Sequence, residues 1–154
     1  MVLQRIDPAL VVASARLLIG TPYEHQGRNR TFGLDCVGLL IEIARDVGAV
    51  WHDLSGYSRD GRITADGKGK SLLRDELSRS LDEIVDVRDA EDGDVLCFWI
   101  DRELVPHHVG IKLGDGMIHA AAMVKGKKGS VVFRTRLASW AKHLDSAWRF
   151  RSHG

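Results

Sequence analysis

The feature that most constrains the fold of this chain is a change of hydrophobic pattern at Asp92-Gly93. Before this point apolar residues recur at helical spacing, whereas after it they form short strand-like runs. Helices that precede strands able to pair antiparallel predict the α+β class. The 154 residues contain no evident linker or repeat, so we expect residues 1–154 to form a single domain with its own core.

Capping and stop signals give approximate bounds for the predicted elements. Asp7 is a suitable N-cap with Pro8 at the first helical position, and Gly20 and Pro22 end that helix. The predicted helices cover residues 8–19, 36–47 and 71–80. The predicted strands cover residues 94–100, 107–113, 117–122, 130–134 and 146–151, with a helical turn near 137–143 and an irregular segment at 51–70.

Cys36 is the leading candidate for chemistry because of its place in the second helix. Asp35 is a good N-cap, so Cys36 would lie in the first helical turn, where unpaired amides and the helix dipole favour a thiolate. A structural cysteine is the alternative, although such residues more often lie in the middle of an element. Cys97 lies in an apolar run typical of a buried strand, so we interpret it as a core residue, although it is also the one cysteine with which Cys36 could pair.

Composition excludes several other classes of protein. The chain carries 22 basic and 21 acidic side chains, which argues against a nucleic-acid or membrane-surface binder. No Cys-x-x-Cys spacing indicates a structural zinc site, and no apolar stretch is long enough to span a bilayer. Residues 1–8 include Arg5 and Asp7 and do not resemble a signal peptide, so we expect synthesis in the cytoplasm without one.

Two histidines are expected to share one face of the strands. His108 has the parity of Gly110 and Lys112, and His107 falls on the opposite face. The turn at 114–116 leads back into His119, and a loop of two or four residues would place His108 and His119 on the same face. A lone strand histidine is usually structural. A cysteine at a helix start with two such histidines, however, suits a nucleophile, its base and a group that orients the base.

Four short pieces follow one another in order from about residue 9 to 151. They are Thr21-Pro22-Tyr23, Leu34-Asp35-Cys36-Val37-Gly38-Leu39, Asp92-Gly93-Asp94-Val95-Leu96, and His108-Val109-Gly110-Ile111 followed by Ile118-His119-Ala120. This ordered set resembles the NlpC-type cysteine peptidases, which are papain-like enzymes that cut cell-wall peptides. The resemblance implies N-terminal helices packed on a central antiparallel β-sheet, and it implies a peptidoglycan endopeptidase that needs no cofactor and no metal.

The same resemblance assigns roles to individual residues. It implies Cys36 as nucleophile, His108 as general base and His119 as the residue that orients the base. Tyr23 would lie near the thiol, and the Cys36 amide would help to stabilise the oxyanion. In cell-wall recycling relatives, the aspartate before the cysteine and the serine after it hold the free amine of the stem peptide. Asp35 remains here as a substrate-binding candidate, but Val37 replaces the serine.

A closer resemblance points to one branch of the family. The segments 23–27, 34–40 and 53–58 are similar to tail-associated cell-wall peptidases of phages, prophages and gene transfer agents. This similarity implies peptidoglycan stem peptides as substrate, other tail proteins as partners, and a place in the virion tail or delivery to the host periplasm. Relatives often have an aromatic residue and paired glycines after the tyrosine, where this chain has Glu24-His25-Gln26-Gly27. His25 is therefore either a cleft residue or an ordinary loop histidine.

Two rival functions remain open from the sequence. One is an inactive or structural tail-assembly module of the same fold, against which the presence of Cys36, His108 and His119 argues. The other is related thiol chemistry, such as amidase, transglutaminase or acyltransferase activity, which the same residues permit. Trp51, Trp99, Trp140 and Trp148 are scattered, and we interpret them as core or cleft-wall residues.

Overall fold

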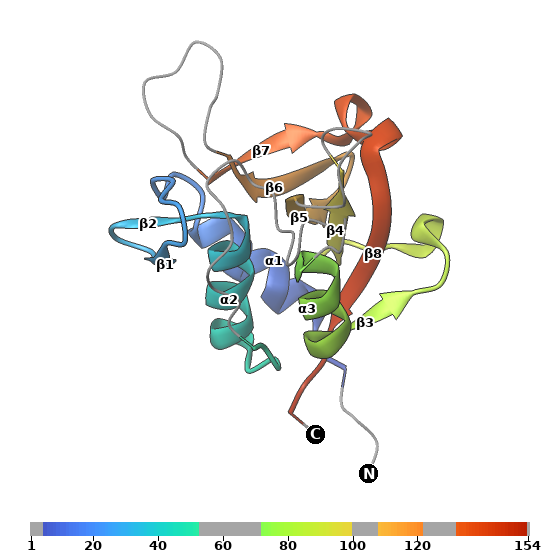
Figure 1. Ribbon diagram of the computed structural model, residues 1–154, viewed down its shortest axis with the longest axis horizontal. Helices are drawn as coiled ribbons and strands as arrows, with labels where there is room; N and C mark the ends of the chain where they lie inside the picture. The colour runs from blue at the N-terminus through green and yellow to red at the C-terminus, as the bar shows by residue number, and fades with distance from the viewer. Residues whose placement is uncertain (1–4, 53–71, 100–107, 122–131, 154) are drawn as a thin grey trace.

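A computed structural model describes residues 5–52, 72–99, 108–121 and 132–153 of the chain. Three helices pack against a six-stranded antiparallel sheet, which confirms the predicted α+β class (Figure 1). The helices are α1 (Pro8–Leu17), α2 (Cys36–Val47) and α3 (Leu72–Ser80). Within the described ranges, no helix combines the length and apolar character needed to cross a bilayer.

The sheet has the strand order β3-β8-β4-β5-β6-β7, and every neighbouring pair is antiparallel. Its strands are β3 (Leu81–Ile84), β4 (Val95–Phe98), β5 (His108–Leu113), β6 (Gly116–Ala120), β7 (Val132–Arg136) and β8 (Leu144–Phe150). A separate two-stranded hairpin, β1 (Arg28–Asn29) and β2 (Gly33–Leu34), leads into α2. The five predicted strands therefore exist with shifted ends, while β3 and the small hairpin were not predicted.

Helix ends follow their capping residues. Asp7 accepts a hydrogen bond from the Ala9 amide, which starts α1 as predicted. The predicted end of α1 at residue 19 is wrong by two residues, because the amides of Leu18 and Ile19 bond back three residues and tighten the last turn. α2 ends as predicted, at Gly48, whose φ of 71° is the left-handed conformation favoured by glycine.

Apolar side chains cover both faces of the sheet. The larger cluster joins the helices to one face of the sheet. Helix residues such as Leu39 and Ile43 pack there with strand residues such as Val109 and Ile118. Each fully buried Leu or Ile of this kind contributes roughly 2 kcal/mol to folding. The smaller cluster lies on the other face of the sheet and includes Leu96, Phe98, Met117 and Ala147. His108 and His119 have the strand parity of this second face.

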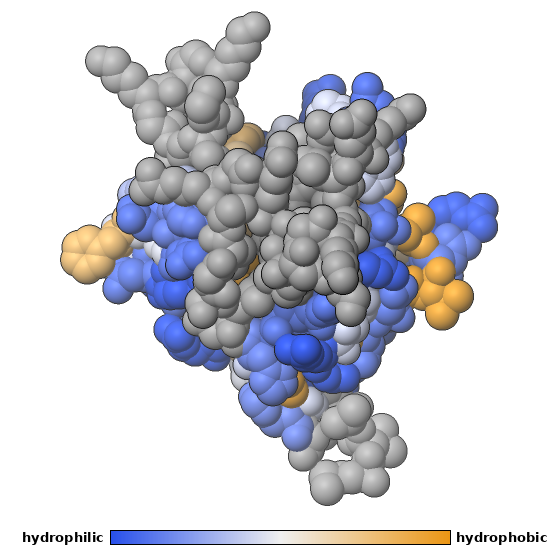
Figure 2. Space-filling model, viewed as in Figure 1, coloured by the Kyte–Doolittle hydropathy of each residue, from blue (hydrophilic) through white to orange (hydrophobic). Residues whose placement is uncertain are grey.

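A short irregular segment packs against the second face between β7 and β8. It consists of two 3₁₀ helices, η2 (Leu137–Ser139) and η3 (Ala141–His143), which confirms the helical turn predicted there. A third 3₁₀ helix, η1 (Val87–Asp89), follows β3. On the face shown in Figure 2, the apolar side chains of the described residues form small, separated patches on a mainly hydrophilic surface. The segment at 53–71, most of which was predicted to be irregular, lies outside the described residues.

Candidate active site

Cys36 is the first residue of α2, as predicted. Asp35 caps the helix by accepting a hydrogen bond from the Gly38 amide at 2.8 Å. The helix then runs through a row of buried residues that pack against β5 and β6. The sequence therefore fixes the thiol at the N-terminal end of a core helix, next to the central strands of the sheet.

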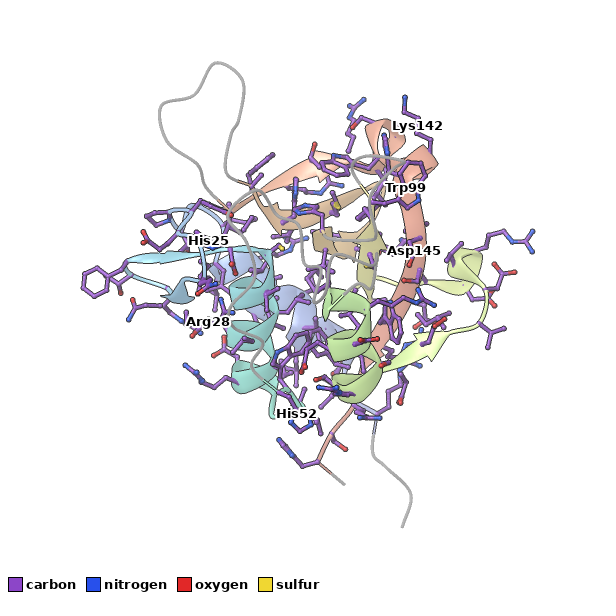
Figure 3. The ribbon with its side chains drawn as sticks, in the orientation of Figure 1. His25, Arg28, His52, Trp99, Lys142 and Asp145 are labelled. Atoms are coloured by element: carbon purple, nitrogen blue, oxygen red, sulfur yellow. The ribbon has the colours of Figure 1, made fainter. Side chains whose placement is uncertain are left out.

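The Asp35 carboxylate also holds the loop before the helix. It accepts from the Gln26 amide at 2.8 Å and forms an ion pair with Arg28 at 3.1 Å, and its side chain is only 3% exposed. The loop packs backbone against backbone on the helix, since a Cβ atom at Gly38 would overlap the carbonyl oxygen of Gly27. Figure 3 shows Arg28 and His25 on the hairpin side of α2. A substrate amine would compete with these donors for the carboxylate.

The thiol of Cys36 lies beside the start of β5. The backbone amides of Val109 and Val37 interact with the thiol in the sense that favours its ionised form, and Val109 directly follows His108 in the chain. Although Cys36 keeps some exposure to solvent, burial raises the pKa of its thiol to about 12, and the nearby Asp35 carboxylate adds to this rise. The two amides and Arg28 act in the opposite direction but do not outweigh burial.

This pKa overturns one expectation from the sequence. We expected the helix start to favour a thiolate, but desolvation and the capping carboxylate favour the neutral thiol in the resting protein. Because a protonated thiol is a weak nucleophile, the arrangement calls for a base that removes the proton during attack.

His108 and His119 lie on the same face, as predicted. The two-residue turn at Gly114-Asp115 pairs Leu113 with Gly116, and this register brings His108 Nε2 to 2.8 Å from His119 Nδ1. Gly110 allows this approach, because a Cβ there would lie 2.7 Å from the Met117 sulfur and 3.2 Å from the His119 Cβ. Both imidazoles are buried, at 7% and 1% exposure for His108 and His119. His107 lies outside the described residues.

His119 is suited to accept a hydrogen bond and not to carry a charge. Burial lowers the pKa of His119 to about 4, so its ring is neutral near pH 7. Its Nε2 atom is buried and has no hydrogen-bond partner in the described part of the chain. If His119 Nδ1 accepts a hydrogen bond from the Nε2–H group of His108, then His108 Nδ1 is left as the basic nitrogen.

The remaining candidates take up positions around this centre. Tyr23 is half-buried, forms an isolated bridge with Leu34 and packs against the larger core. His25 is half-buried in the preceding loop. Cys97 is fully buried, pairs with Val109 across the sheet and is not disulfide-bonded, which confirms its interpretation as a core residue. Within the described residues, no group of three His, Cys, Asp or Glu side chains is arranged to hold a metal ion.

Two contacts of this site were not predicted from the sequence. Arg28 pairs with the capping carboxylate, and Trp140 stacks on the His108 ring with centroids 5.1 Å apart. Trp140 was predicted only as a core or cleft-wall residue. Trp140 lies between η2 and η3, in the connection from β7 to β8. No pattern in the sequence predicts the course of that connection.

Solved structures share this architecture. The crystal structure of the NlpC/p60 domain of the peptidoglycan hydrolase SagA is 27% identical, with a TM-score of 0.57, 93% of this chain covered and 98% of that one. An NLP/P60-family lipoprotein-like protein of Staphylococcus aureus is 21% identical, with a TM-score of 0.62, 99% of this chain covered and 44% of that one. An NlpC protein of Trichomonas vaginalis is 17% identical, with a TM-score of 0.69 and coverages of 99% and 47%. The chain therefore spans less than half the length of the last two.

A search of curated protein sequences found no match. The model of the NlpC/P60 family, however, matches residues 20–149, which include the capped cysteine, both histidines and the sheet that holds them. The match covers most of the chain, and Cys36 at the start of α2 lies within it. The chain belongs to the NlpC/P60 family.

Proposed function

We propose that this chain is a cysteine peptidase that hydrolyses peptide bonds in peptidoglycan stem peptides. The observation that carries the proposal is the 2.8 Å contact of His108 with His119, on a strand whose next residue, Val109, has its amide beside the Cys36 thiol. Family membership and the similarity to a domain of a peptidoglycan hydrolase support a cell-wall substrate.

In this mechanism the side chains act in sequence. His108 takes the thiol proton as the Cys36 sulfur attacks the scissile carbonyl carbon, and the oxyanion accepts a hydrogen bond from the Cys36 amide. The C–N bond then breaks, His108 returns the proton to the leaving amine, and a thioester remains on Cys36. Water activated by His108 hydrolyses that thioester. His119 holds the His108 ring in orientation throughout and stays neutral.

The bond proposed for cleavage joins the side chain of D-glutamate to diaminopimelate. The test is mass spectrometry of stem peptides incubated with the protein, using one peptide with a free L-alanine amine and one with that amine acylated. Because Asp35 is paired internally and Val37 offers no hydroxyl, we expect the acylated peptide to be cut at least as fast. A strong preference for the free amine would contradict this expectation, and fragments from a different bond would reassign the specificity.

The role proposed for His119 gives a ranked prediction. Asparagine can accept a hydrogen bond from His108 but alanine cannot, so activity should follow the parent, then His119→Asn, then His119→Ala. Cys36 should still react with iodoacetamide in both variants, as measured by mass spectrometry of the modified peptide. A His119→Ala variant as active as the parent would show that another group orients the base, and His25 or a backbone carbonyl would be tested next.

We further propose that the protein acts from a phage, prophage or gene-transfer-agent tail, on the host wall or in the host periplasm. The support is the sequence similarity at 23–27, 34–40 and 53–58, of which the last segment lies outside the described residues. Proteomic analysis of purified particles tests this placement, because a tail component should co-purify with the other tail proteins. Its absence from such particles would remove the tail assignment and leave the peptidase assignment intact.

A further inference from the structure

Trp140 contacts both rings of the histidine pair. Its ring stacks on His108 at 24° between planes and meets His119 edge-on, with centroids 5.5 Å apart. Phe98 contacts Trp140 in turn, with centroids 5.4 Å apart and a T-shaped geometry. The indole thus covers the His108 ring and also contacts the ring to which His108 hydrogen-bonds.

The backbone holds Trp140 in this position from both sides. The Trp140 amide donates to the Leu137 carbonyl at 2.8 Å, and the His143 amide donates to the Trp140 carbonyl at 2.8 Å. The Leu137 amide donates to the Asp115 carbonyl, which ties the segment to the turn between β5 and β6. Trp140 also packs against the cluster on the second face of the sheet. Its ring is therefore placed by the same turn that sets the register of the two histidines.

We propose that Trp140 is a positioning residue that stabilises the protonated state of His108 during catalysis. The inference rests on the proposed function, in which His108 becomes an imidazolium when it takes the thiol proton. A cation over the face of an indole ring is attracted by the negative π-face, and most strongly where water is excluded. His119 supplies a hydrogen-bond acceptor but no negative charge, since burial keeps it neutral. The indole also shields the bond between the two imidazoles from water, which strengthens that bond.

Among the described residues, ionisable groups on two of the packed elements lie around the His108 strand. His119 faces it from β6, and Cys36 lies at the start of α2, with Asp35 and Arg28 beside the thiol. Substitutions of Trp140 leave all of these groups in place. A difference in the titration of His108 between an aromatic and an aliphatic replacement of Trp140 therefore reports the aromatic face.

The test compares Trp140→Phe with Trp140→Leu, two apolar variants that differ in whether a π-face remains. We expect Trp140→Phe to keep most of the parent kcat. Trp140→Leu should fall about tenfold below it with KM little changed, as a desolvated cation–π contact allows. NMR titration of the His108 ring protons without substrate should show the midpoint lowered by about half a pH unit or more in Trp140→Leu alone. Trp148→Phe, a buried tryptophan on β8, serves as the control for general loss of packing.

Equal kcat values and equal titration midpoints in Trp140→Phe and Trp140→Leu would overturn the proposal and leave Trp140 as a space-filling residue. If Trp140→Leu does not fold, Trp140→Met replaces it in the same comparison. Should the parent protein cleave no stem peptide, the proposed function fails, yet the substrate-free titration still decides whether Trp140 stabilises the charged imidazole.

Discussion

Replacing Cys36 with alanine is expected to abolish the release of stem-peptide fragments. The sulfur is the protein atom that forms the covalent bond to the scissile carbon in the proposed mechanism, and removal of such a nucleophile costs on the order of 10⁶ in kcat. The helix should survive the change, because Asp35 caps it through the Gly38 amide and not through the thiol. The measurement is mass spectrometry of fragments over time, with circular dichroism to confirm the fold.

Cys97 provides a matched control for this result. It is the second free cysteine of the described residues. It is buried on β4, opposite Val109 of β5. We expect Cys97→Ala to lose some stability through the small cavity it leaves, and to remain active at temperatures where it is folded. If Cys36→Ala still released fragments at the rate of the parent, the nucleophile would have to be another group.

Replacing His108 with alanine should cost about 10³-fold or more in kcat/KM. The neutral Cys36 thiol must lose its proton to attack, and this variant lacks the imidazole proposed to accept that proton. Iodoacetamide should also modify Cys36 more slowly near pH 7 in this variant, which checks the thiol–base coupling without any peptide substrate. Both rates are to be compared with those of the parent at the same pH.

His107→Ala is the control for register, since His107 precedes His108 and falls on the opposite strand face by parity. We expect it to cost far less than His108→Ala. The reverse order of losses would show that His107 is the base and that the proposed roles are shifted by one residue.

Local signals in the sequence predicted the parts of the site that depend on neighbouring residues. Asp35 before an apolar run placed Cys36 at a helix start, and the turn after Leu113 placed His108 and His119 on one face. Strand β3 was missed because Leu81-Asp82-Glu83-Ile84 shows no alternation of apolar and polar residues. It forms as the edge strand of the sheet through its pairing with β8, in which Leu81 lies opposite Phe150, 69 residues later in the chain.

Long-range packing decided what the sequence did not predict. The Cys36 pKa is raised because the thiol is buried in the assembled fold. The ion pair of Arg28 with Asp35 forms because the β1–β2 hairpin folds back on α2. Trp140 reaches His108 only because β7 and β8 lie at separate places in the sheet and the connection between them crosses its second face. Contacts of this kind arise from the assembled fold, so no local sequence pattern predicts them.

The turn at Gly114-Asp115 has a consequence for how this fold can diverge. Pairing of Leu113 with Gly116 leaves two residues in the connection. Strand parity then places His108 and His119 on the same face of the sheet. Exchanging one turn-forming residue for another leaves the two imidazoles together, whereas inserting or deleting a single residue would turn His119 to the opposite side of the sheet. The parity of the loop length therefore constrains this segment, and residue type is constrained as well at Gly114, whose φ is 58°. An insertion or deletion of one residue here would separate the two imidazoles, whereas an insertion of two would keep them on one face.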